Sequence, residues 1–180
     1  NQTLDAYYVV NHYEFDQLVE IFFKYGEEKY SKSIAKRIVE SRKEKPIETT
    51  LELVELIKTS VPEKYKREKH PARKIFQAIR IEVNDELNVF KKALVDSLEL
   101  LKINGRICVI TFHSLEDKIC KSVFKEVTQI DETLKKLPII PSEYLPKFKI
   151  VKTIEPTKEE INLNKRARSA KLRIIEKTLK

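Results

Sequence analysis

His113 and Ser114 are the residues whose types and position point most directly to chemistry. They follow the apolar run 107–112, which predicts a buried strand, and a helical pattern begins directly after them. Polar side chains at the carboxyl end of an α/β strand are where such folds place ligands and reacting groups. Ser114 and Asp117 also have the spacing of a capping box, so helix capping with a satisfied histidine is an equally good interpretation.

The His113-Ser114 pair does not indicate a serine hydrolase. No Gly-x-Ser-x-Gly elbow is present, and adjacent residues cannot act as nucleophile and base in the usual geometry. We therefore interpret the pair as lining a pocket in which a base or cofactor lies against the strand end. No metal site is expected, because His12, His70 and His113 are far apart in sequence and no Cys-x-x-Cys spacing accompanies them.

Asn84 and Asp85 are a second pair of candidate pocket residues. They interrupt an apolar stripe with helical spacing that runs from residue 71 to residue 101, and this stripe predicts one long helix. Glu86 belongs to the same interruption, and because the stripe continues on both sides, we expect at least one of Asn84, Asp85 and Glu86 to face the ligand edge of the sheet. A solvated helix face is the more frequent alternative for such a polar group.

The glycine content excludes one class of site. The chain has 2 glycines, Gly26 and Gly105, and each is expected to end a helix in the left-handed conformation. No Gly-rich loop is therefore present to bring backbone amides against a cofactor. The chain also has no methionine, from which we expect it to be an internal or trimmed piece of a longer protein.

The net charge of +8 and the pI near 9.3 favour an anionic partner. Residues 1–30 are acidic, and the basic residues gather in two later clusters. One lies within residues 64–74, and the other, the carboxyl-terminal basic cluster, consists of Lys165, Arg166, Arg168, Lys171 and Arg173. Clustered guanidinium groups favour bidentate contacts with phosphate, although a solvated surface is the plainer alternative. The residues that we expect to bind RNA phosphates are Lys64, Lys66, Arg67, Lys69, Arg73, Arg166, Arg168 and Lys171.

The hydrophobic pattern predicts a mixed α/β chain in two parts. Residues 1–70 show only helical spacing and end in a basic linker at 62–70, and three strands are expected near 106–112, 147–154 and 170–177. Thr49 with Glu52, and Thr157 with Glu160, have the spacing of helix caps and predict the starts of two further helices. No run is long enough to cross a membrane. Cys108 and Cys120 form no metal or disulfide pattern, which indicates a reducing, cytoplasmic location.

Five stretches of the sequence resemble one family over long runs and in the same order. They are YGEE (25–28), KPIETT (45–50), HPARKIFQAIRIEVNDEL (70–87), VITFHSLED (109–117) and NKRARSAKLR (164–173). Together they resemble the carboxyl-terminal part, somewhat more than half, of the bacterial 16S rRNA (cytosine-N4)-methyltransferases, the RsmH or MraW family. One departure is Lys102-Ile103-Asn104-Gly105, where the family usually has Pro-Gly-Gly, and we expect it to change only a turn.

The resemblance implies a partial class I (Rossmann-like) S-adenosylmethionine methyltransferase sheet with an all-helical inserted domain. Residues 1–70 would be the helical insertion, which helps to recognise rRNA. Residues 71–180 would be the carboxyl-terminal part of the methyltransferase domain and supply its strands 5–7. The family's cofactor site lies mainly in amino-terminal motifs that are absent here, so no cofactor-binding residue is assigned in this chain.

The activity implied is S-adenosylmethionine-dependent methylation of N4 of a cytidine in the decoding region of 16S rRNA, with the small ribosomal subunit as partner. The catalytic residues stay unknown; His113, Ser114, Asn84 and Asp85 are candidates for shaping the pocket. The chain alone is expected to be inactive, and its unpaired strand 107–112 to favour association, a homodimer included. The alternative is a non-catalytic basic module that binds rRNA. A DNA-binding regulator is disfavoured, because the first helices lack helix-turn-helix spacing.

Overall fold

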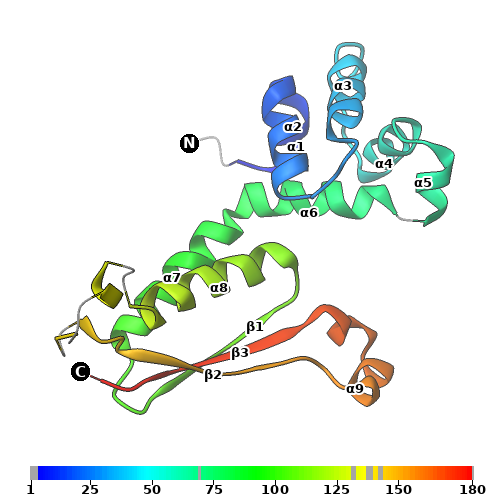
Figure 1. The fold of residues 1–180 in the computed structure, drawn as a ribbon. Helices are drawn as coiled ribbons and strands as arrows, with labels where there is room; N and C mark the ends of the chain where they lie inside the picture. Colours follow the sequence, from blue (N-terminus) through cyan, green and yellow to red (C-terminus); the bar gives the residue numbers. More distant parts are fainter. Residues whose placement is uncertain (1–3, 69, 131–132, 137–139, 142–143, 180) are drawn as a thin grey trace. The chain divides into compact units, whose positions relative to one another are not determined.

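The computed structural model describes residues 4–68, 70–130, 133–136, 140–141 and 144–179. Two compact units divide the chain, Asn1–Glu86 and Leu87–Lys180, and each has its own hydrophobic core (Figure 1).

The first unit is helical throughout its described residues, as the sequence pattern predicts. Its helices are α1 (Ala6–His12), α2 (Phe15–Lys24), α3 (Ser31–Ser41), α4 (Thr50–Thr59), α5 (Glu63–Glu68) and α6 (Pro71–Asn84). Helix α6 packs against α1, α2 and α4, and α2 packs against α3. Phe22, Ile38, Ile57 and Ile75 are fully buried in the shared core. The apolar stripes of these helices therefore converge on one core, built along α6.

The capping box predicted at the start of α4 is present. Thr49 Oγ1 accepts a hydrogen bond from the Glu52 amide at 3.2 Å, and the Glu52 carboxylate accepts from the Thr49 amide at 2.9 Å. The backbone donors of Glu48 and Thr49 lower the pKa of Glu52 to about 2. This box fixes where α4 begins.

Two expectations for the first unit were wrong. The segment expected to be a linker forms α5, because Tyr65 is buried and its hydroxyl donates to the buried carboxylate of Glu28 at 2.7 Å. Gly26 is not left-handed; that conformation belongs to Glu27, with φ 47°. A Cβ at Gly26 would lie 2.6 Å from the Phe22 oxygen and 2.8 Å from the Lys74 oxygen, so glycine is needed there for a close approach of α6.

The long helix predicted over residues 71–101 is two helices. Helix α6 ends at Asn84, Asp85 takes the left-handed conformation with φ 49° and ψ 36°, and α7 starts at Glu86. The Glu86 carboxylate accepts from Arg80 Nε at 2.8 Å and from Asn84 Nδ2 at 3.2 Å, which holds the break. The apolar stripe could not reveal it, because the spacing resumes in phase beyond Asp85. Helix α6 therefore packs within the first compact unit, and the assignment of residues 71–180 to a methyltransferase domain stays a prediction.

The second unit combines helices with a three-stranded sheet. Its elements are α7 (Glu86–Leu100), β1 (Arg106–Thr111), α8 (Ser114–Thr128), η1 (Leu134–Lys136), β2 (Phe148–Ile154), α9 (Lys158–Leu163), η3 (Lys165–Ser169) and β3 (Lys171–Lys177). The three strands lie where the sequence predicts them. The order is β1-β3-β2, and β3 is antiparallel to both neighbours, so β1 and β2 run parallel to each other.

The two faces of this sheet differ. Figure 1 shows α7 and α8 side by side against one face, where Val109 and Ile175 pack with helix side chains such as Phe124. On the other face Cys108 and Ile110 are exposed. The strand expected over residues 107–112 is therefore present but buried on one face only, where Val109 and Thr111 lie, and Cys108 is exposed whereas Cys120 is buried. The run contains only apolar and small residues, which hides the period-two alternation of a half-buried strand.

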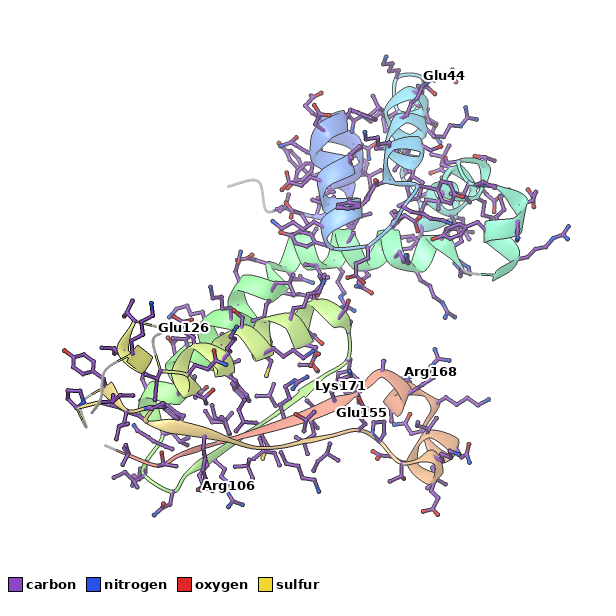
Figure 2. The ribbon with its side chains drawn as sticks, viewed as in Figure 1. Glu44, Arg106, Glu126, Glu155, Arg168 and Lys171 are labelled. Carbon is purple, nitrogen blue, oxygen red and sulfur yellow. The ribbon has the colours of Figure 1, made fainter. Side chains whose placement is uncertain are left out.

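Ion pairs cross all three strands at one end of the exposed face, the end where Figure 2 labels Arg106. Glu176 on β3 pairs with Arg106 on β1 and with Lys149 on β2, each at 2.6 Å. These two cations lower the pKa of the Glu176 carboxyl. The opposite end of the same face is apolar, because the register places Leu172 between Ile110 and Ile154.

Candidate functional site

The junction between β1 and α8 is a capping box, set one residue earlier than predicted. His113 is the N-cap residue, and its Nδ1 accepts from the Glu116 amide at 3.4 Å. Glu116 Oε2 in turn accepts from the amides of Phe112, at 2.8 Å, and His113, at 3.3 Å. His113 is extended, whereas Ser114 is already the first residue of α8, so the predicted Ser114–Asp117 box does not form.

The cap uses one of the two ring nitrogens of His113, Nδ1. Nε2 is buried and lies 3.2 Å from Glu116 Oε1, in a geometry that makes no hydrogen bond. The structure thus supports helix capping at this junction, with His113 and not Ser114 as the cap residue. The histidine is not fully satisfied as that interpretation expected, because Nε2 has no hydrogen-bond partner among the described residues. Its further role in a pocket, and that of Ser114, stays a prediction.

Asp117 anchors α8 to the sheet instead of capping the helix. Its carboxylate accepts two hydrogen bonds from Arg173 on β3, at 2.7 and 3.2 Å, and lies 3.0 Å from Lys121 Nζ. The Arg173 guanidinium also donates to Thr153 Oγ1 on β2 at 3.0 Å. Hydrogen bonds from Arg173, and then from Lys121, hold the pKa of Asp117 below its ordinary value. Arg173 belongs to the carboxyl-terminal basic cluster in the sequence, but its role is structural, because its guanidinium holds α8 and β2 to β3.

Arg166 and Arg168 of that cluster lie on the segment that connects β2 to β3. This segment contains α9 and η3 and is called the α9–η3 excursion. Thr157 caps α9 as predicted, and Asn164 Oδ1 accepts from the Arg166 amide at 3.1 Å, which fixes the start of η3. Arg166 and Arg168 are exposed, and no ion pair holds either within the described residues. Lys171 lies 3.4 Å from Glu155. Figure 2 shows both near Arg168, at the end of the sheet where β1 ends and β3 begins.

A pocket of about 260 Å³ adjoins these cations, on the apolar end of the exposed sheet face. Its floor is the cross-strand row Ile110, Leu172 and Ile154, and the α9–η3 excursion forms a wall. Phe112, just beyond the end of β1, lines the pocket and is 54% exposed. The remaining lining residues are Glu155, Pro156, Glu160, Asn164, Ala167 and Ala170. The pocket therefore lies between the end of β1 and the α9–η3 excursion, which carries Arg166 and Arg168.

This pocket was not predicted from the sequence. A buried strand over residues 107–112 would have placed Ile110 in a core, and Phe112 was counted as part of that strand. The missed signal was the spacing of Cys108, Ile110 and Phe112, which places the three on one face of an extended chain. Glu160 and Asn164 carried no signal of their own.

The basic residues predicted near the first unit have varied surroundings. Lys64, Lys66 and Arg67 lie on α5, where Lys66 pairs with Glu63. Arg73 is exposed in the first turn of α6. Lys69 lies outside the described residues.

Asn84 and Asp85 belong to the first compact unit, whereas His113 and Ser114 belong to the second. Asn84 donates to Glu86, and Asp85 forms the left-handed end of α6. That the four line one pocket stays a prediction.

In the part of the chain that the structure describes, no cluster of three or more His, Cys, Asp or Glu side chains could hold a metal ion. None of the described helices is both long and apolar enough to span a membrane.

Comparison with known protein families agrees with the resemblance in the sequence. The family described as the MraW methylase family matches residues 1–178, which covers both compact units and every element of the second. The match includes the β1–α8 junction and the α9–η3 excursion, where the exposed cations lie. The chain therefore belongs to the MraW methylase family, a family of methyltransferases for which S-adenosylmethionine is the implied methyl donor.

Proposed function

We propose that the chain works as part of an S-adenosylmethionine-dependent methyltransferase that methylates N4 of a cytidine in the decoding region of 16S rRNA. The observation that carries the proposal is the strand order β1-β3-β2, with an antiparallel strand between two parallel ones, in a chain of the MraW methylase family. In the class I methyltransferase sheet the fifth strand lies next to the seventh. Strands β1, β2 and β3 would then be strands 5–7 of a Rossmann-like sheet.

The residues present do not by themselves fit a complete adenosylmethionine site. Such a site needs backbone amides that can approach a nucleoside cofactor, and glycine usually makes this possible. Gly26 packs against the Lys74 oxygen, and a Cβ at Gly105 would lie 2.8 Å from the Lys102 oxygen in the turn before β1. Both glycines are used for local packing. In the proposal the cofactor loop belongs to polypeptide that pairs with the edge of β1, and the enzyme works in the cytoplasm.

The part assigned to this chain is to hold and orient RNA. Orientation of a substrate supplies a large share of the rate of many enzymes. Lys171 pairs with Thr111 at the carboxyl end of β1, which is the edge where α/β folds bind ligands. Arg166 and Arg168 flank Ala167, which lines the pocket at this end together with Phe112. Arg166 and Arg168 are exposed and can form bidentate contacts with phosphate. The partner would be 16S rRNA within the small ribosomal subunit.

A non-catalytic rRNA-binding module is the second candidate. The net charge of +8 and the exposed cations of η3 require only binding, and they would serve that role without a cofactor. Family membership favours the enzyme, because a methylase family implies methyl transfer.

Methyl transfer from tritiated adenosylmethionine to small ribosomal subunits that lack the modification tests the proposal. The full-length protein should label 16S rRNA, and mass spectrometry of its nucleosides should find N4-methylcytidine. Tight rRNA binding without transfer would support the module instead. Label in another nucleoside would overturn the assignment to N4 of cytidine.

A further inference from the structure

We propose that the pocket at the end of β1 holds one unstacked base of single-stranded RNA, with the flanking phosphates bound by Arg166 and Arg168. The inference deepens the proposed function and rests on its premise that the ligand is RNA. It does not depend on methyl transfer.

The size and floor of the pocket suit a single base. Its volume of about 260 Å³ lies below the roughly 300–1,000 Å³ of pockets for drug-sized ligands, which fits one planar ring better than a larger molecule. Ile110, Leu172 and Ile154 form an apolar row across three strands. A base that leaves its stack can replace stacking with contact on such a surface.

Phe112 supplies the aromatic group that recognition of single-stranded RNA usually requires. Its ring lines the pocket and is 54% exposed, although a large apolar side chain at a strand end would ordinarily be covered. Glu116 accepts a hydrogen bond from the Phe112 backbone amide at 2.8 Å, so the capping box of α8 also fixes the backbone that carries the ring. A ring on a fixed backbone is a stacking platform for a base.

The polar lining can read the edge of a base. Glu160 offers a carboxylate, an acceptor for an exocyclic amine such as that of cytosine, and the structure gives its side chain no partner among the described residues. Asn164 uses Oδ1 for the Arg166 amide, so its side-chain nitrogen is the group available to donate to a ring nitrogen or carbonyl. Glu155 is less available, because it pairs with Lys171.

The charge at the rim favours a nucleic acid over a protein as occupant. Arg166 and Arg168 flank Ala167, whose side chain lines the pocket, and neither has an ion pair within the described residues. An apolar pocket for a partner helix would need no such cations. A phosphodiester chain places its charges beside the base, as this arrangement requires.

The test compares two short ribose-phosphate strands by fluorescence anisotropy with the 180-residue chain. One strand is abasic except for a central cytidine, and the other is abasic throughout, so both carry the same phosphates. Because a base gains free energy by stacking on an aromatic ring, the strand with cytidine should bind about tenfold more tightly, which is about 1.4 kcal/mol. Phe112→Leu should remove this difference and Phe112→Tyr should retain it. Phe23→Leu, at an aromatic residue 68% exposed on α2, is the matched control and should change nothing.

Arg166→Ala with Arg168→Ala should weaken binding of both strands by the same factor. Equal affinity of the wild-type chain for the two strands would overturn the proposal, as would a tenfold difference that survives Phe112→Leu. If Phe112→Leu alters only the association state in sedimentation, the pocket is a protein interface and the proposal is wrong. Base discrimination without methyl transfer would leave the pocket standing and refute only the enzyme.

Discussion

The two units of the chain treat their apolar surface differently. In the first, the stripes of α1–α4 meet α6, and side chains such as Phe22 and Ile38 are fully buried. In the second, α7 and α8 cover one face of the sheet, while Ile110 and Phe112 are more than half exposed on or beside the other. This exposed apolar surface adjoins Arg166 and Arg168, which have no ion pair within the described residues, and such a combination usually marks a site of interaction. The first unit thus buries its apolar stripes in its own core, whereas the second leaves apolar side chains exposed on one face of its sheet, where a partner can bind.

The largest effect should come from the core of the first unit. Phe22→Ala removes a fully buried ring and should lower the free energy of unfolding by about 3–5 kcal/mol. The neighbouring Phe23, 68% exposed, is the control, and its change to Ala should stay within about 0.5 kcal/mol. Denaturant unfolding followed by circular dichroism measures both. Similar losses for the two variants would contradict the assignment of the core.

A pair of isoleucines on opposite faces of the sheet sharpens the comparison within the second unit. Ile175→Ala should cost about 2–5 kcal/mol, because the side chain is fully buried against the helices. Ile110→Ala should cost less than about 0.5 kcal/mol, because the side chain is 56% exposed. A large loss at Ile110 would show that the exposed face is covered in solution.

The anchor between α8 and the sheet should matter less than either core. Asp117→Asn leaves the half-buried Arg173 without its carboxylate partner and should cost about 1–3 kcal/mol near neutral pH. Because the folded-state pKa of Asp117 is lowered, this stability is present above its ordinary value of 3.8 and is lost as the pH falls below it. Unfolding curves of wild type and variant should converge in acid, and Thr153→Val tests the weaker contact to β2. A gap between the curves that stays constant in acid would argue against the ion pair.

The smallest effect is expected at the start of α4. Thr49→Ala should cost about 1 kcal/mol, because it removes one half of the capping box. The Glu52 half should lose its contribution as the pH falls from the ordinary value of 4.5 towards about 2, since backbone donors stabilise the ionised carboxylate. Amide exchange of the first turn of α4 should report both changes. Glu55→Gln, which leaves the box intact, is the control.

How much the sequence could predict depended on how local each signal was. The caps at Thr49 and Thr157 and the three strands were found because they depend on residues a few positions apart. The left-handed break at Asp85 was missed because the apolar spacing resumes in phase beyond it. The turn at residues 102–105 was expected to differ from the family only locally, and there Asn104 takes φ 64°.

Features that depend on distant partners could not be predicted. Arg173 seemed to belong with Arg166 and Arg168, but its hydrogen bonds to Asp117, across 56 positions, make it structural. The pocket lined by Phe112 and Asn164 likewise exists only because the register of β1 and β3 brings the end of β1 beside the α9–η3 excursion.

The most direct test of the central claim is isothermal titration of adenosylmethionine into the 180-residue chain. In the function that we propose, the second unit is one side of a methyltransferase sheet whose cofactor loop lies in other polypeptide. We therefore expect no saturable heat at micromolar concentrations, with both units folded by circular dichroism. A micromolar dissociation constant, on the order of −8 kcal/mol, would contradict it, because the site would then be complete within these residues.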